Sequence, residues 1–76
     1  MEANFKFIKH PTAKNLQRRS VSFQHEEISF IQPNDWVNII VMMPSGEITL
    51  NLSGKYFLTK LTSAKKGSST FKVFKF

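Results

Sequence analysis

The chain has 76 residues, a formal net charge of +6 at pH 7 and no cysteine. This length allows one domain, residues 1–76, with a small core, and the lack of cysteine excludes disulfides and thiolate metal sites. No apolar run approaches the roughly 20 residues that span a bilayer. Residues 1–10 also lack the basic-then-apolar order of a signal peptide. We expect a complete, soluble, unsecreted protein in the cytoplasm, with no membrane partner.

The first predicted element is a short, half-buried strand over residues 4–10. Phe5 and Phe7 point to one face there, and the residues between them point to the other. Pro11 ends the strand, because proline cannot donate a ladder hydrogen bond. Residues 12–18 are ambiguous: a threonine can cap a helix, but few apolar residues follow it. A basic loop or a single helical turn is predicted.

Alternation resumes over residues 18–24, which predict a second strand. Residues 25–27 are polar and predict a turn. Residues 28–31, with the sequence ISFI, predict a third short strand. A proline followed by Asn and Asp in residues 32–35 then predicts a turn, because these residue types favour turn geometry.

The central stretch, residues 35–61, predicts a three-stranded antiparallel meander. Two turn signals, at residues 44–46 and 53–54, separate two apolar runs and a third, alternating run. Strand 36–43 is apolar on both faces and must therefore be covered on both sides. In so short a chain, that cover is either a barrel with a well-covered exterior or a partner.

The register of the hairpin 36–52 stays open at this point. A three-residue turn pairs Ile40 with Leu50, whereas a four-residue loop pairs Val41 with Leu50. Turn chemistry favours the first register, but a slip of one residue exchanges the two faces of the strand. In the next hairpin, a two-residue turn pairs Leu50 with Phe57 as a core pair.

A polar loop is predicted over residues 62–69 and a last strand over residues 70–76. Together these elements predict an all-β fold, a small antiparallel barrel of SH3-like or OB-like size. It has six to seven short strands built on the central meander 35–61. At most one short helical turn is expected, near residues 12–18.

The charge is segregated along the chain. All eleven lysines and arginines lie before Ser20 or after Gly54, whereas four of the five acidic residues lie between them. If the two basic ends share a face, they form a positive patch that attracts polyanions. Whether they do is open, and net charge for solubility is the alternative.

Basic residues also alternate with aromatic ones, as in proteins that bind single strands. We therefore predict low-specificity binding of single-stranded DNA or RNA through a basic patch and exposed aromatics. The competing interpretation is that the phenylalanines belong to the core and that the lysines between them are their solvated neighbours. The candidate binding residues are Lys6, Lys14, Arg18, Arg19, Trp36, Lys55, Tyr56, Lys65, Lys66 and Lys72.

No enzyme, cofactor or metal is expected. No catalytic triad spacing or glycine-rich phosphate loop occurs, and His25 beside Glu26 and Glu27 is interpreted as a solvated turn. The alternative function is a protein-interaction module, such as a viral or mobile-element accessory protein that binds and modulates an acidic host protein. A homodimer that shares strand 36–43 or strand 70–76 is expected under either function.

Overall fold

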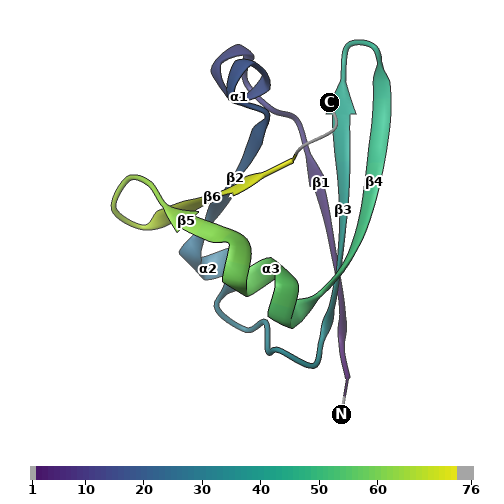
Figure 1. Ribbon diagram of the computed structural model, residues 1–76, viewed down its shortest axis with the longest axis vertical. Helices are drawn as coiled ribbons and strands as arrows, with labels where there is room; N and C mark the ends of the chain where they lie inside the picture. The colour runs from purple at the N-terminus through teal and green to yellow at the C-terminus, as the bar shows by residue number, and fades with distance from the viewer. Residues whose placement is uncertain (1, 74–76) are drawn as a thin grey trace.

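The computed structural model describes residues 2–73, which form two open three-stranded sheets and three short helices (Figure 1). Sheet A has the strand order β1-β3-β4, with β1 parallel to β3 and β4 antiparallel to it. Sheet B has the order β2-β6-β5 and is antiparallel throughout. The elements are β1 (Asn4–Lys9), α1 (Ala13–Arg18), β2 (Ser20–Gln24), α2 (His25–Ile28), β3 (Trp36–Met43), β4 (Gly46–Ser53), α3 (Gly54–Lys60), β5 (Leu61–Ser63) and β6 (Ser68–Lys72).

The predicted all-β barrel is wrong. Neither sheet closes on itself in the described part of the chain, and the fold is a small α/β arrangement. The parallel pairing of β1 with β3 places Phe5 beside Val37 and Phe7 beside Ile39. It joins segments about thirty residues apart through a long crossover, as parallel strands require. A meander of successive hairpins cannot contain such a pairing.

The third strand of the predicted meander is helix α3. Ser53, which reads as a hairpin turn, is instead the helix N-cap, and its Oγ accepts a hydrogen bond from the Tyr56 N–H at 3.1 Å. Serine favours this capping role because it satisfies an amide that has no partner within the helix. The expected pair of Leu50 with Phe57 therefore does not form. Phe57 is fully buried, but it reaches the core from the helix.

The start of α3 is held by a network around Asp35, which is 4% exposed. The Asp35 carboxylate accepts hydrogen bonds from the Gln32 N–H at 2.8 Å and the Ala3 N–H at 3.0 Å. Its backbone carbonyl accepts one from the Gly54 N–H at 2.7 Å. The Asp35 side chain thus ties the N-terminal segment to the loop before β3, and its backbone carbonyl holds the first turn of α3.

The β3–β4 hairpin has a two-residue turn, so both predicted registers are wrong. Met43 lies opposite Gly46, and Val41 lies opposite Ile48. Of the two predictions, the four-residue loop had assigned the faces correctly. Val37 and Val41 are fully buried, as is Ile39 between them.

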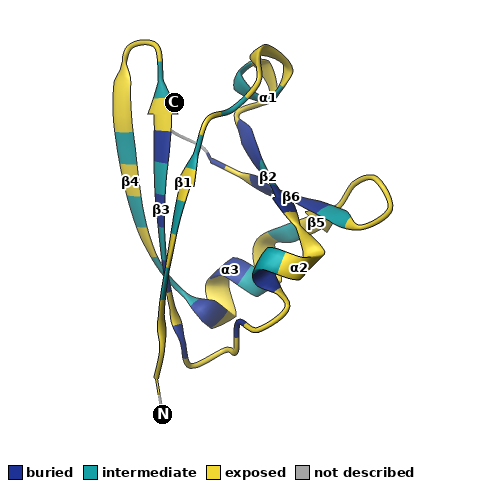
Figure 2. Ribbon diagram, turned by 180° about the vertical axis from the view of Figure 1, so that it is seen from behind, coloured by how far each residue is buried: buried dark blue, intermediate teal, exposed yellow. Residues whose placement is uncertain are grey.

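The core between the sheets is aromatic. The rings of Phe7 and Phe57 each meet Phe23 edge-to-face, with centroids 5.3 and 5.1 Å apart respectively. Phe57 also stacks on Phe71 at 5.3 Å. Figure 2 shows the buried positions along β3, β2, β6 and α3, where these layers face one another. The interpretation of the phenylalanines as core is confirmed for these four.

The remaining segments correct the sequence prediction further. The predicted strand 28–31 is wrong, since α2 and a turn occupy this region and Phe30 is 72% exposed. Strand β6 begins two residues before the predicted strand 70–76, of which residues 74–76 lie outside the described part. Within residues 2–73, no helix is both long and apolar enough to cross a membrane.

Candidate nucleic-acid interface

A cavity of about 730 Å³ lies between the C-terminal end of α1 and sheet B, and we call it the basic groove. Three cationic side chains line it: Arg18 and Arg19 from the end of α1, and Lys72 from β6. All three residues are exposed to solvent. The groove therefore joins charges from the two basic ends of the chain, which settles that these ends share a face at this point.

Arg19 has an unusual backbone. It is the C-cap of α1 and adopts the left-handed conformation, with φ 56° and ψ 45°. Its N–H donates to the Leu16 carbonyl at 3.1 Å, and its own carbonyl accepts from the Val73 N–H at 2.7 Å. This conformation costs a non-glycine residue roughly 1–2 kcal/mol, and glycine usually occupies it. The protein therefore carries the long Arg19 side chain at a cost in backbone free energy.

The floor of the basic groove is the face of sheet B that points away from the core. Phe71 faces inward, so its neighbours Thr70 and Lys72 lie on the outer face. Ser20 is the cross-strand partner of Lys72, and Thr62 is the partner of Thr70. Three hydroxyl groups therefore lie on the same surface as the lysine.

Helix α1 supplies the wall of the groove. Thr12 caps the helix by accepting from the Asn15 N–H at 3.2 Å, so the segment predicted as a loop or a single helical turn is a six-residue helix. The expectation of at most one helical turn is wrong, since α2 and α3 are also helices. Asn15 in turn donates from its side-chain amide to Ser22 Oγ at 3.0 Å, which ties the helix to the outer face of sheet B. Asn15 and Gln17 both line the groove.

The lining of the basic groove has the character of an anion site. It holds three cations and several hydroxyl and amide groups, whereas no residue that lines it within the described chain carries a carboxylate. Arginine and lysine donate to phosphate oxygens, and hydroxyl groups add neutral donors. A volume of about 730 Å³ also lies in the range of about 300–1,000 Å³ that is usual for ligand sites.

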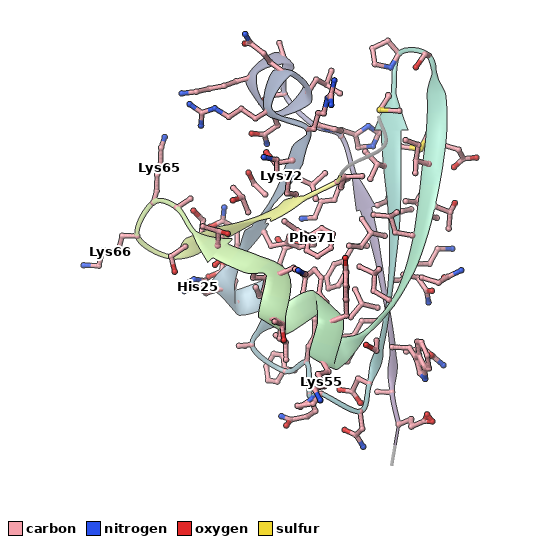
Figure 3. The ribbon with its side chains drawn as sticks, in the orientation of Figure 1. His25, Lys55, Lys65, Lys66, Phe71 and Lys72 are labelled. Carbon is pink, nitrogen blue, oxygen red and sulfur yellow. The ribbon has the colours of Figure 1, made fainter. Side chains whose placement is uncertain are left out.

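Three more of the predicted basic residues lie near this groove. Lys14 is exposed on α1 itself. Lys65 and Lys66 lie in the turn between β5 and β6, directly after Ala64, which lines the groove. In Figure 3, Lys65 extends toward the end of the molecule that carries α1, whereas Lys66 points outward from the turn.

Four predicted site residues lie elsewhere. Lys6 and Trp36 are on the outer face of sheet A, where the Trp36 indole donates to Glu2 at 3.2 Å. Lys55 and Tyr56 are in the first turn of α3, and Lys55 points to the end of the molecule opposite α1 (Figure 3). The structure therefore does not bring the two predicted stacking aromatics into the basic groove.

Tyr56 lines a second, mostly apolar groove of about 390 Å³, together with β4 side chains such as Leu50 and Leu52. Its ring is 43% exposed and lies 5.7 Å from the Lys60 Nζ. Lys72 borders this groove as well as the basic one. It is therefore the one predicted basic residue within residues 2–73 that lines both.

Sequence reasoning missed the neutral lining of the basic groove. Ser20, Thr62 and Thr70 were predicted only as polar positions of strands or loops. The alternation of Ser20 with Val21, and of Thr70 with Phe71, was a usable signal, because it assigns these hydroxyls to the face of the strand opposite the core. Which other segment faces that surface is not encoded in the alternation.

No metal centre is present among residues 2–73, where no three His, Cys, Asp or Glu side chains form a cluster. His25 lies 3.2 Å from Ser69 Oγ through its Nε2 and thus contacts sheet B.

Comparison with protein-family models, with curated proteins and with solved structures gives no significant match.

Proposed function

We propose that the basic groove binds the backbone of a single-stranded nucleic acid with little sequence specificity. One observation carries the proposal: Arg18, Arg19 and Lys72 come from opposite ends of the chain and line one cavity without a carboxylate. Each guanidinium can hold a phosphate through two parallel hydrogen bonds, and the lysine adds a point charge.

The strained backbone of Arg19 supports the same proposal. Glycine would relieve the strain at φ 56°, yet the chain carries a long cationic side chain there. Residues held in sparsely populated backbone conformations are concentrated at functional sites. A binding role of the Arg19 side chain thus explains why arginine stands at a position where the backbone favours glycine.

The helices and aromatics support a single strand that is bound mainly by its phosphates. The longest helix described, α3, has seven residues, and it offers no extended recognition helix for a major groove. Trp36 and Tyr56 do not line the basic groove, so base stacking contributes little there. Contacts to phosphate are independent of base identity, which accounts for low sequence specificity.

The proposal is tested by titrating the full chain with a single-stranded oligonucleotide at several salt concentrations. Three cations that each neutralise one phosphate predict a slope of log K against log salt of about −2. Arg18→Ala and Lys72→Ala should each weaken binding and flatten the slope. Lys55→Ala, at the far end of the molecule, is the matched control and should change neither (Figure 3). Binding that does not weaken with salt would contradict the proposal.

A second candidate function, protein interaction, is favoured by the outer face of sheet A. Ile8, Trp36 and Met42 are 57%, 45% and 39% exposed, and Ile8 is the register partner of Ile40. Exposed apolar residues that gather on one face of a small protein are typical of interaction surfaces; here Ile8, Ile40 and Met42 are neighbours, whereas Trp36 lies at the other end of β3. This surface includes the strand 36–43 that was expected to form a homodimer. Met42→Lys should abolish self-association in sedimentation if the second candidate is correct, and a monomer at high concentration would contradict the dimer.

A further inference from the structure

We infer that the basic groove prefers RNA to DNA, because it presents hydrogen-bond acceptors that match a ribose 2′-hydroxyl. The inference rests on the proposed function and concerns the same site. Phosphate groups are common to both polymers, so the three cations alone do not distinguish them. The 2′-hydroxyl, which both donates and accepts, is the group that lets a protein recognise RNA.

The first acceptor is on Asn15. Its side-chain Nδ2 donates one hydrogen to Ser22 Oγ at 3.0 Å, so the carbonyl Oδ1 is left as an acceptor for a ligand, beside the second N–H of Nδ2. Phosphate oxygens only accept hydrogen bonds and cannot pair with a carbonyl oxygen. A hydroxyl can donate to it.

The second acceptor is on Thr70. Its hydroxyl donates to the Thr62 carbonyl at 3.5 Å, which leaves the oxygen lone pairs for a donor from the ligand. The side chain of Thr62 is the cross-strand neighbour of Thr70 and adds a hydroxyl that can donate or accept.

These neutral groups alternate with the cations in space. Ser20 is the cross-strand partner of Lys72, and Thr70 lies two residues before Lys72 on the same face of β6. Asn15 lies one helical turn before Arg18 and Arg19. A strand whose phosphates meet the cations would thus place its sugars near the hydroxyl and amide groups. The phosphate oxygens of either polymer cannot donate to these acceptors, whereas RNA carries on every sugar a 2′-hydroxyl that can.

The test compares oligouridine, the matched oligodeoxyuridine and 2′-O-methyl oligouridine with the full chain at one salt concentration. We expect RNA to bind roughly two- to tenfold more tightly than DNA, the effect of one or two net hydrogen bonds. The 2′-O-methyl polymer cannot donate from its sugar and should bind like DNA. Equal affinities for RNA and DNA would overturn the inference and leave the proposed function intact. The absence of salt-dependent binding to all three would overturn the proposed function itself.

Two variants test whether Thr70 contributes to the preference for RNA over DNA. Thr70→Val keeps the shape and strand propensity of threonine but removes one of the two acceptors, so it should reduce the preference for RNA over DNA, with DNA affinity unchanged. Thr49→Val, at an exposed position of β4 outside the basic groove, is the matched control and should preserve the RNA preference. An equal loss of RNA and DNA binding in Thr70→Val would contradict the inference. Unchanged unfolding curves establish that each variant is folded.

Discussion

Gly54 lies directly against the backbone carbonyl of Gln32. A Cβ added to Gly54 would be 2.0 Å from that oxygen, and the Gly54 N–H donates to the Asp35 carbonyl at 2.7 Å. The first turn of α3 is therefore pressed onto the loop that precedes β3. This contact explains why residues 53–54 begin a helix and do not form a hairpin turn.

Gly54→Ala is predicted to destabilise the fold strongly. Helix propensity alone would favour alanine by about 1 kcal/mol. The clash is with backbone, so either the loop or the helix must shift, at a cost of roughly 1–3 kcal/mol or more. Chemical denaturation should show a clear decrease in the free energy of unfolding. Gly67→Ala, where no atom lies within 4 Å of the added carbon but φ is +81°, measures the cost of backbone strain without a clash, and its destabilisation should be smaller, about 1 kcal/mol. A stabilised Gly54→Ala variant would show that the close contact is not maintained.

Asp35→Ala is predicted to loosen the contact between the N-terminal segment and the loop before β3. Two backbone amides, of Ala3 and Gln32, would lose a buried carboxylate acceptor. Hydrogen bonds to a charged group contribute about 1.5–3 kcal/mol each, so a loss of several kcal/mol is expected. Asp35→Asn retains one acceptor oxygen and should lose less. Hydrogen exchange should show faster exchange at both amides in the alanine variant, and slow exchange at both would contradict this role. Glu47→Ala, at an exposed position of β4, should leave stability unchanged.

Arg19→Gly is predicted to separate stability from binding. Glycine adopts the left-handed conformation of Arg19 freely, so the variant should be as stable as the parent or more stable by up to ~1 kcal/mol. Oligonucleotide affinity should fall because one of the three groove cations is lost. Thermal unfolding and a binding titration together check both parts. A variant that is stable and still binds fully would remove Arg19 from the proposed interface. Arg19→Lys keeps the charge and should bind with intermediate affinity.

Lys9 is predicted to stabilise the hydrophobic core and to contribute nothing to binding in the basic groove. It forms an ion pair with Glu27, and its Nζ lies 4.4 Å from the Phe23 ring centroid. Lys9→Ala removes a cation–π contact and the packing of the aliphatic stem, and should cost about 1–2 kcal/mol of stability. Lys6→Ala, on the outer face of the same strand, should cost almost nothing. The comparison is made by urea denaturation, and equal effects of the two substitutions would contradict the assignment.

Strand faces were predictable from local pattern. The alternation around Phe5 and Phe7 assigned their half-buried face correctly, and the apolar run 36–43 is a strand with the predicted bounds. Thr12 signalled a helix start that the structure confirms. In each case the signal is local, because period-2 burial and N-capping depend only on neighbouring residues.

The errors arose where one pattern fits two structures. The segment after Ser53 can form a hairpin arm or a capped helix, and the contact of Gly54 with the loop 32–35 selects the helix. The pairing of β1 with β3 is parallel and joins segments distant along the chain, so no tight turn connects the two strands and no turn residue predicts the pairing. Without these two contacts, successive hairpins were the simplest interpretation, and they led to the barrel.

The sequence by itself determined that the chain is basic at both ends, that phenylalanines near both ends alternate with lysines, and that strands occur within residues 4–10 and 36–43. Charge and the period of apolar side chains are properties of the sequence, so they do not depend on whether the strand topology was predicted correctly. Only the tertiary structure decided that Arg18 and Arg19 meet Lys72, and that Trp36, Lys6 and Lys55 lie elsewhere. The reason is physical: the antiparallel pairing of β2 with β6 brings residues about fifty positions apart onto one surface, through backbone hydrogen bonds that do not depend on side-chain charge.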